Sequence, residues 1–269
     1  MNSSGDRPGG GSASAKRAAA RAGDHPVVEW GARLGYAASG VLHLLLAYLT
    51  AQIALGGGSQ EASQSGALAT LAEKPVGQVL LWVIAAGFAL LALWQLTELV
   101  TRYEASDKAK AGGKLVLYSA LAWTSFTLAS GGRTSTSQQT EEFTATLMEA
   151  PGGRVVVGLV GVAIIGIAAY HVDKGWRERF LQDLQEHPGR GVVLAARVGY
   201  IGKGIALAAV GILFITAAIQ QRAGKATGLD GGLRSMRDLP AGTVVLLGIA
   251  LGLAAYGVYS FARARYARV

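Results

Sequence analysis

His43 is the ionisable side chain that lies deepest within an apolar run of this sequence, and it is the first candidate for chemistry. An imidazole titrates near physiological pH, so His43 could bind a ligand or gate a passage. Tyr36, Gly40 and Ala47 lie on the same helical face as His43, at helical intervals. We predict that His43, Tyr36 and the later Tyr200 line a cavity. A hydrogen bond to a neighbouring helix is the alternative and commoner role for such a histidine.

The other residue types argue against catalysis. The chain has no cysteine, which removes disulfides, thiolate metal sites and cysteine nucleophiles. Glu98 lies at the end of an apolar run without a second carboxylate for a proton relay, and no Ser, His and Asp arrangement has the setting that hydrolysis needs. No glycine cluster follows a strand and ends in Lys-Ser/Thr, as a phosphate loop does. We predict no catalytic, cofactor or metal site, and no enzyme activity.

Composition places the chain in the membrane class, because 51% of its 269 residues are apolar and only 16% are charged. Lys and Arg number 25 against 17 Asp and Glu. These cations lie between apolar blocks and not along one polar face, which argues against nucleic acid. We predict the lipid bilayer as the main partner, with another membrane protein or a second copy of the chain as further partners.

Runs of about 20 apolar residues match the thickness of a bilayer. Five stand out, and they are Leu34–Leu55, Val76–Val100, Val155–Val172, Val198–Ile219 and Thr243–Phe261. A sixth, Leu115–Ala129, is shorter, and the stem of Lys114 could extend it at the membrane surface. The predicted fold is therefore an all-α polytopic membrane bundle of six spans.

The basic residues predict the orientation of the chain. Most of them fall on the side that holds both termini and the second and fourth connections, so both termini are predicted to be cytoplasmic in the plasma membrane. Residues 1–26 are rich in Gly, Ser, Ala and Arg and predict a disordered tail. The segment Lys174–Leu184 mixes cations with large apolar side chains and predicts a helix lying on the inner leaflet, with a soluble partner as the alternative.

One short motif precedes the second, fourth and sixth spans. An apolar residue, an acid, a proline and a glycine follow one another at intervals of two, and the last two positions are Pro75 and Gly77, Pro151 and Gly153, and Pro240 and Gly242. Proline suits the first turn of a helix, the acid complements the positive helix end, and glycine lets a neighbouring helix approach. We interpret the motif as structural. It divides the chain into two-helix repeats at 27–103, 104–180 and 181–269, the last with a short basic C-terminal tail.

Other features recur with the repeats. Short amphipathic stretches, opened by Ser65 in the first repeat and Thr140 in the second, precede each proline and predict interfacial helices. Each even span ends near an aromatic residue and a basic-aromatic pair that fit membrane anchors. These residues are Trp94 with Arg102-Tyr103, Tyr170 with Arg179-Phe180, and Tyr259 with Arg265-Tyr266.

The first and fifth spans open with the same sequence pattern. Arg33 to Tyr36 and Arg197 to Tyr200 both read Arg-x-Gly-Tyr, and each is followed by a further glycine, Gly40 or Gly204. The third span keeps only Lys114 and Tyr118. With its Arg-x-Gly-Tyr openings and Pro-x-Gly helix starts, the chain resembles the bacterial, actinobacterial-type membrane proteins catalogued as domain of unknown function 1206. The resemblance covers roughly Val27 to Tyr266 and implies three tandem two-helix repeats without implying an activity.

Two functions remain open. Because each repeat holds two spans, the repeats are parallel, and their symmetry axis would run along the membrane normal. Three hairpins around that axis either enclose a cavity or pack solid. We expect a structural, accessory or scaffolding membrane protein, and the alternative is a channel or transporter for a small solute or ion. Gly248 and Gly252 could mark a dimer face, although packing within the bundle is the commoner use.

Overall fold

The computed structural model describes residues 26–58, 60–73, 75–101, 105–184 and 188–266, and within these ranges the chain is helical without a strand. The long helices are α2 (Pro26–Ala54), α4 (Pro75–Thr101), α5 (Ala105–Ala129), α7 (Gly153–Trp176), α8 (Arg190–Gln220) and α10 (Gly242–Tyr266). The predicted all-α class is confirmed. The predicted tail lies outside the described residues apart from Pro26.

Five of these helices are long and apolar enough to cross a membrane. The segments are Gly35–Ala54, Pro75–Leu93, Gly153–Trp176, Arg190–Gln220 and Gly242–Tyr266. The chain is therefore a polytopic membrane protein. The sixth predicted span forms the C-terminal part of α5. It does not reach the same apolar length among the described residues, because Lys108, Lys110 and Lys114 occupy the N-terminal part of that helix.

A short helix stands before the second long helix of every repeat, as predicted. These are α3 (Gln64–Ala72), α6 (Thr136–Glu149) and α9 (Gly228–Arg237). The first two begin earlier than their sequence predicted, because Ser63 and Ser135 are the N-caps and their hydroxyls accept the backbone N–H of Gly66 and Gln138. α6 contacts both α3 and α9, and the end of the bundle that holds these three helices is called here the short-helix end.

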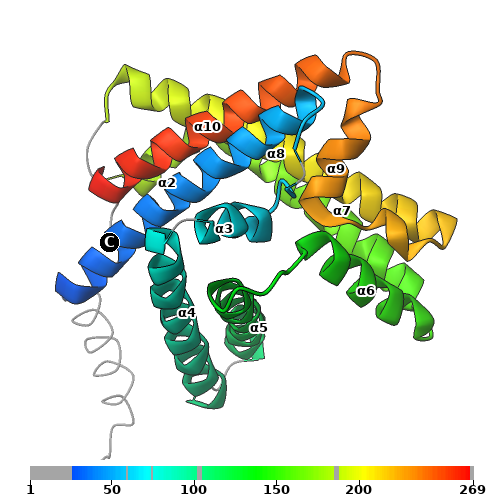
Figure 1. The fold of residues 1–269 in the computed structure, drawn as a ribbon, viewed down its shortest axis with the longest axis horizontal. Coiled ribbons are helices and arrows are strands. Elements are labelled where there is room, and N and C mark those ends of the chain that lie inside the picture. Colours follow the sequence, from blue (N-terminus) through cyan, green and yellow to red (C-terminus); the bar gives the residue numbers. More distant parts are fainter. Residues whose placement is uncertain (1–25, 59, 74, 102–104, 185–187, 267–269) are drawn as a thin grey trace, which may run out of the picture.

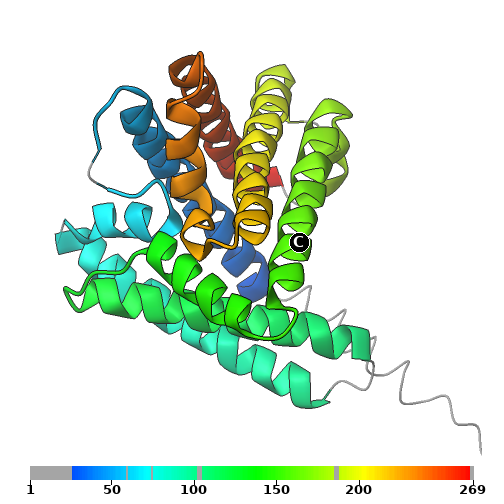
Figure 2. The ribbon, with the colours of Figure 1, turned by 90° about the vertical axis from the view of Figure 1, so that its right-hand side faces the viewer.

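The long helices pair across repeat boundaries. α4 packs on α5, α7 on α8, and α10 on α2, so each repeat's second helix lies along the next repeat's first helix, and the third repeat returns to the first. Within a repeat, α8 packs along α10, but in the part of the chain that the structure describes α2 has no such packing on α4, nor α5 on α7. In Figures 1 and 2 the α4–α5 hairpin stands apart and runs across the direction of α7, α8 and α10. The repeats are thus cyclically linked units and not three separate hairpins.

Glycines set the distance between the paired helices at equivalent places. A Cβ on Gly204 of α8 would lie 2.8 Å from the carbonyl oxygen of Ala168 in α7. A Cβ on Gly40 of α2 would lie 2.8 Å from the ring of Phe261 in α10. Gly40 and Gly204 are the glycines that follow the two Arg-x-Gly-Tyr openings. The recurring glycine therefore allows the first helix of a repeat to pack on the preceding repeat.

Candidate functional site

The Pro-x-Gly motif forms a corner between each short helix and the long helix that follows. A Cβ on any of its three glycines would overlap the backbone carbonyl oxygen of the apolar residue that opens the motif. The pairs are Gly77 with Leu71, Gly153 with Leu147, and Gly242 with Met236. The glycine is therefore required where the long helix meets the last turn of the preceding short helix.

The prolines do not all begin a helix. Pro75 is the first residue of α4, as predicted. Pro151 and Pro240 instead lie in the turn, because α7 and α10 start at Gly153 and Gly242. The second and third corners also share their backbone hydrogen bonds, since the N–H of each glycine donates to the residue before the proline, at 2.9 and 2.8 Å.

The residue between proline and glycine distinguishes the first corner from the other two. Gly152 and Ala241 have φ angles of 78° and 60°, in the left-handed region. Val76, at the same place in the first repeat, is helical. A β-branched residue is a rare occupant of the left-handed region. The valine side chain thus disfavours, at the first corner, the turn that the other two repeats use.

His43 lies buried, 8% exposed, where α2 meets α8 and α10. The 2.7 Å contact of its Nδ1 with the Ser39 carbonyl oxygen assigns the proton to Nδ1. Its Nε2 then accepts a hydrogen bond from Lys203 Nζ at 3.3 Å. The same Nζ lies 4.3 Å from the centroid of the Tyr256 ring, which is 4.5 Å from the His43 ring. His43 is therefore part of a three-helix contact with two partners that the sequence did not identify.

Tyr200 and Tyr36 lie near this three-helix contact, and each is linked to it through other side chains. Tyr200 is 3% exposed, and its ring is 5.2 Å from that of Tyr256. Tyr36 is half-buried and lies under the guanidinium of Arg263. Tyr256 thus joins Tyr200 to His43, and the charged residues described next connect Tyr200 to Tyr36. That the three residues line a cavity stays a prediction.

Two equivalent cations cover the two tyrosines of the Arg-x-Gly-Tyr openings. Lys174 Nζ lies 5.4 Å from the ring centroid of Tyr200, and the Arg263 guanidinium carbon lies 4.5 Å from that of Tyr36. Asp183 links the cations, at 2.7 Å from Lys174 and 3.7 Å from Arg263. Each tyrosine thus receives a cation from the preceding repeat. Lys174 follows Pro151 at the same interval as Arg263 follows Pro240, and this equal spacing was the sequence signal for the two pairs.

The connection between α7 and α8 folds inward. It contains the 3₁₀ helix η1 (Arg179–Asp183), in which Phe180 is fully buried and stacks 5.7 Å from Tyr200. Leu184 is 3% exposed. The predicted helix on the inner leaflet is therefore wrong for this segment, because Phe180 and Leu184 fill the protein core, although Trp176 is 64% exposed.

The predicted aromatic anchors also differ from one another. Tyr170 is 53% exposed, as an anchor would be, but Tyr259 is fully buried against Phe180. Arg102 and Tyr103, and the side chains of Trp94 and Glu98, lie outside the described residues.

Glu61 joins the first and second repeats at the short-helix end. Its carboxylate accepts hydrogen bonds from the hydroxyls of Ser63, Ser65 and Ser135, and from the Thr136 N–H at 3.1 Å. The negative charge thus sits at the positive N-terminus of α6. Polar residues of this kind in a loop gave no repeat signal in the sequence.

Equivalent residues on the three short helices each face the next repeat. Ser65 of α3 accepts the N–H of Thr136 at 3.1 Å. Asp230 of α9 accepts the N–H of Ala62 at 2.8 Å. Glu141 of α6 lies close to Gly224, where a Cβ would be 2.8 Å from its Oε1. The short-helix end therefore closes the same cycle of repeats as the long helices do.

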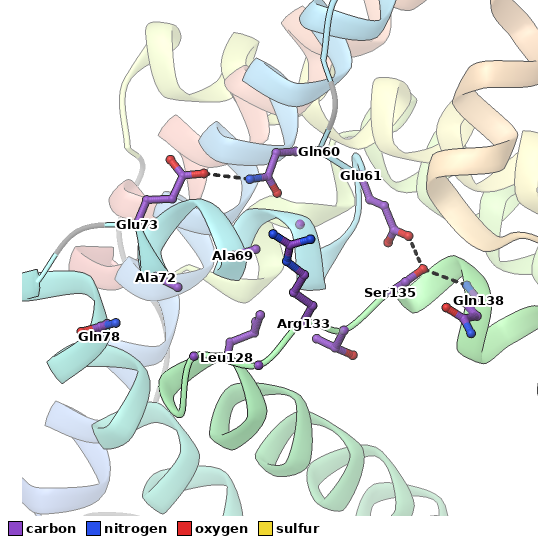
Figure 3. Close-up of a pocket in the computed structure, with 14 residues that line it drawn as sticks. Gln60, Glu61, Ala69, Ala72, Glu73, Gln78, Leu128, Arg133, Ser135 and Gln138 are labelled. Carbon is purple, nitrogen blue, oxygen red and sulfur yellow. Dashed lines mark hydrogen bonds between the residues drawn. The ribbon is translucent and has the colours of Figure 1, made fainter.

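A pocket of about 690 Å³ lies between α3 and the connection from α5 to α6. In Figure 3, Arg133 extends from that connection toward α3, between Glu73 and Glu61. Glu73 accepts a hydrogen bond from Gln60 at 2.8 Å. Polar side chains line the pocket, yet within the described ranges no three His, Asp or Glu groups are placed to hold a metal ion.

These observations define a class of protein, a polytopic membrane helix bundle built from three cyclically packed repeats. The family described as Domain of Unknown Function (DUF1206) matches residues 34–102, 109–178 and 198–267, and the chain belongs to it. Each matched region falls inside one of the three repeats. The chain is 29% identical to Uncharacterized protein YxxB of Bacillus subtilis (strain 168), over 87% of this chain and 89% of that protein. No solved structure matches the chain.

Proposed function

We propose that this protein is a structural or accessory component of the plasma membrane, which scaffolds or stabilises other membrane proteins. The supporting observation is the direct backbone contact between successive helices. Cβ atoms on Gly161 and Gly211 would each lie 2.9 Å from the other's carbonyl oxygen, which joins α7 to α8, and Gly202 meets Gly252 between α8 and α10. Contacts this close hold the helices in one fixed arrangement.

A test of the scaffold role needs a partner and a consequence. A photoreactive amino acid at Phe143, which is 69% exposed on α6, is expected to form a reproducible adduct with a membrane protein. The same substitution at Leu251, 67% exposed on α10, is the control for contact with lipid. The adduct partner should also fall in abundance in cells that lack this chain. Unchanged abundance of every captured protein would contradict the proposal.

Conduction of a small solute or ion is the second candidate, and the contact between His43 and Lys203 favours it. Ionisable groups inside membrane spans are costly and often serve transport. Flux into proteoliposomes, compared between wild type and His43→Ala, separates the two candidates. The scaffold role predicts background leak for both proteins. A wild-type flux that His43→Ala removes would establish conduction.

We propose that both termini are cytoplasmic, because the connections on that side carry most of the Lys and Arg. The proposal requires α5 to cross the membrane, since five crossings would leave the termini on opposite sides. Reporter domains fused separately to the two ends, active only in the cytoplasm, test both points together. Signal from the N-terminal fusion alone would mean an odd number of crossings.

A further inference from the structure

The third repeat is closed by a glycine contact between its own two helices. A Cβ on Gly199 of α8 would lie 2.6 Å from the Tyr256 backbone in α10. A Cβ on Gly202 would lie 2.7 Å from the Gly252 Cα atom, so the two backbones touch. This contact shows how the two long helices of one repeat pack together.

The first repeat carries the same face but does not use it. Counting from the shared tyrosine and proline, Gly35 and Ala38 of α2 correspond to Gly199 and Gly202, and Gly87 of α4 corresponds to Gly252. Cβ atoms on Gly35 and Gly87 would meet nothing within 4 Å among the described residues.

The second repeat has an equivalent unused face. Counting from the starts of the family matches, Gly113 of α5 corresponds to Gly202, and in this register Lys108 corresponds to Arg197 in place of the predicted Lys114. Counting from the prolines, Ala163 of α7 corresponds to Gly252. A Cβ on Gly113 would meet nothing within 4 Å among the described residues, and Ala163 is exposed. In its present position the α4–α5 hairpin holds α4 away from α2 and α5 away from α7, so both pairs of matching faces stay apart.

The membrane favours bringing these faces together. The Pro75–Leu93 segment of α4 has a mean hydropathy of 2.3, equal to that of α7. Side chains such as Val76 and Leu90 are 81% and 69% exposed on it. While the hairpin runs across α7, α8 and α10, as in Figure 2, α4 and those helices cannot all follow one membrane normal. Turning the hairpin upright would let α4 cross the membrane alongside those helices.

We propose that in the bilayer the α4–α5 hairpin swings upright as a unit, so that α4 docks on α2 and α5 docks on α7. The six long helices then form a closed ring in which each repeat pairs its two helices as α8 pairs with α10, with the methyl groups of Ala38 and Ala163 holding the first two pairs further apart than Gly202 and Gly252 do. The structure shows the open arrangement of the same chain. This arrangement is independent of the scaffold role, because it concerns how the chain packs on itself.

The first corner determines how easily the hairpin turns. In the closed third repeat the residue between proline and glycine, Ala241, is left-handed, whereas Val76 in the first repeat is helical. Because valine disfavours the left-handed region, the first corner opposes the turn that closes the third. The corner therefore sets a barrier that glycine would lower.

Disulfide trapping tests the closed arrangement directly, because the natural chain has no cysteine. Ala38→Cys with Gly87→Cys joins α2 to α4, and Gly113→Cys with Ala163→Cys joins α5 to α7. The control for a formed contact is Gly158→Cys with Ala218→Cys, since a Cβ on Gly158 lies 3.5 Å from that of Ala218, within disulfide range. Ala38→Cys with Ala89→Cys is the matched negative pair, because Ala89 points away from the face of Gly87.

In proteoliposomes under mild oxidation, both test pairs should form an intramolecular disulfide as fully as the formed-contact pair, and the negative pair should not. Adding Val76→Gly should accelerate the trapping of the α2–α4 pair by about fivefold or more, whereas Val76→Ala should not. Test pairs that react no more than the negative pair would overturn the proposal. Disulfide-linked dimers in place of intramolecular bonds would also overturn it, in favour of docking between copies.

Discussion

Gly202 and Gly252 meet backbone to backbone, since a Cβ on either would lie 2.7 Å from the Cα atom of the other. This contact joins the two helices of the third repeat. The sequence left open whether Gly248 and Gly252 mark a dimer face or pack within the bundle. The contact shows that Gly252 packs within the bundle. Gly248 has nothing within 4 Å of a Cβ among the described residues.

Gly202→Ala should destabilise the protein by about 1–3 kcal/mol, the usual cost of overpacking a close contact. The added methyl group must push α8 and α10 apart. Thermal unfolding in detergent, followed by helical circular dichroism, measures the change. Gly248→Ala is the matched control and should leave the melting temperature unchanged or slightly raised. Equal melting temperatures for wild type and Gly202→Ala would show that the two helices are further apart.

Ala241→Gly should stabilise the third corner by up to about 1 kcal/mol, because glycine adopts a left-handed conformation without the Cβ penalty. Gly152→Ala at the equivalent position should destabilise the second corner by a similar amount. Chemical or thermal unfolding of the purified variants compares them. The two substitutions must shift stability in opposite directions, and a shared direction would refute the left-handed assignment.

Glu61→Ala should loosen the junction between the first and second repeats, since several donors lose their acceptor. The Thr136 N–H keeps its hydrogen bond to Ser65 and is expected to lose part of its protection from hydrogen exchange, and the loss of stability should be about 1.5–3 kcal/mol for the hydrogen bonds to the charged carboxylate that are removed. Hydrogen exchange of the peptide that contains Thr136 measures this effect. Glu73→Ala removes an exposed carboxylate with one partner and should leave that peptide protected.

Asp183→Asn should weaken the link between Lys174 and Arg263, because the neutral amide no longer balances two cations. Both cations are largely buried, with side chains 14% and 23% exposed, so the expected loss is about 1–3 kcal/mol. A double-mutant cycle with Lys174→Met isolates the direct pair. Additive effects of the two substitutions would show that Lys174 and Asp183 do not interact.

The repeat pattern predicted the helices well, because it depends on local rules. Apolar length, proline and glycine positions and capping hydroxyls act within a few residues, so the long helices and the three short ones could be located in advance. Prediction failed where contacts between residues far apart in the sequence decide whether a side chain is buried. Phe180 reads as a membrane anchor beside Arg179, but it is buried because Tyr200 and Tyr259 come together around it.

By itself, the sequence determined a membrane protein of three two-helix repeats, because hydrophobic length and local turn chemistry are written along the chain. Only the tertiary structure decided which helices pair, that α4 lies on α5 and α10 on α2, and which side chains surround His43. The physical reason is that helices in lipid have similar apolar surfaces, so their partners are selected by close glycine contacts and by charges such as Asp183 that lie far apart in the chain.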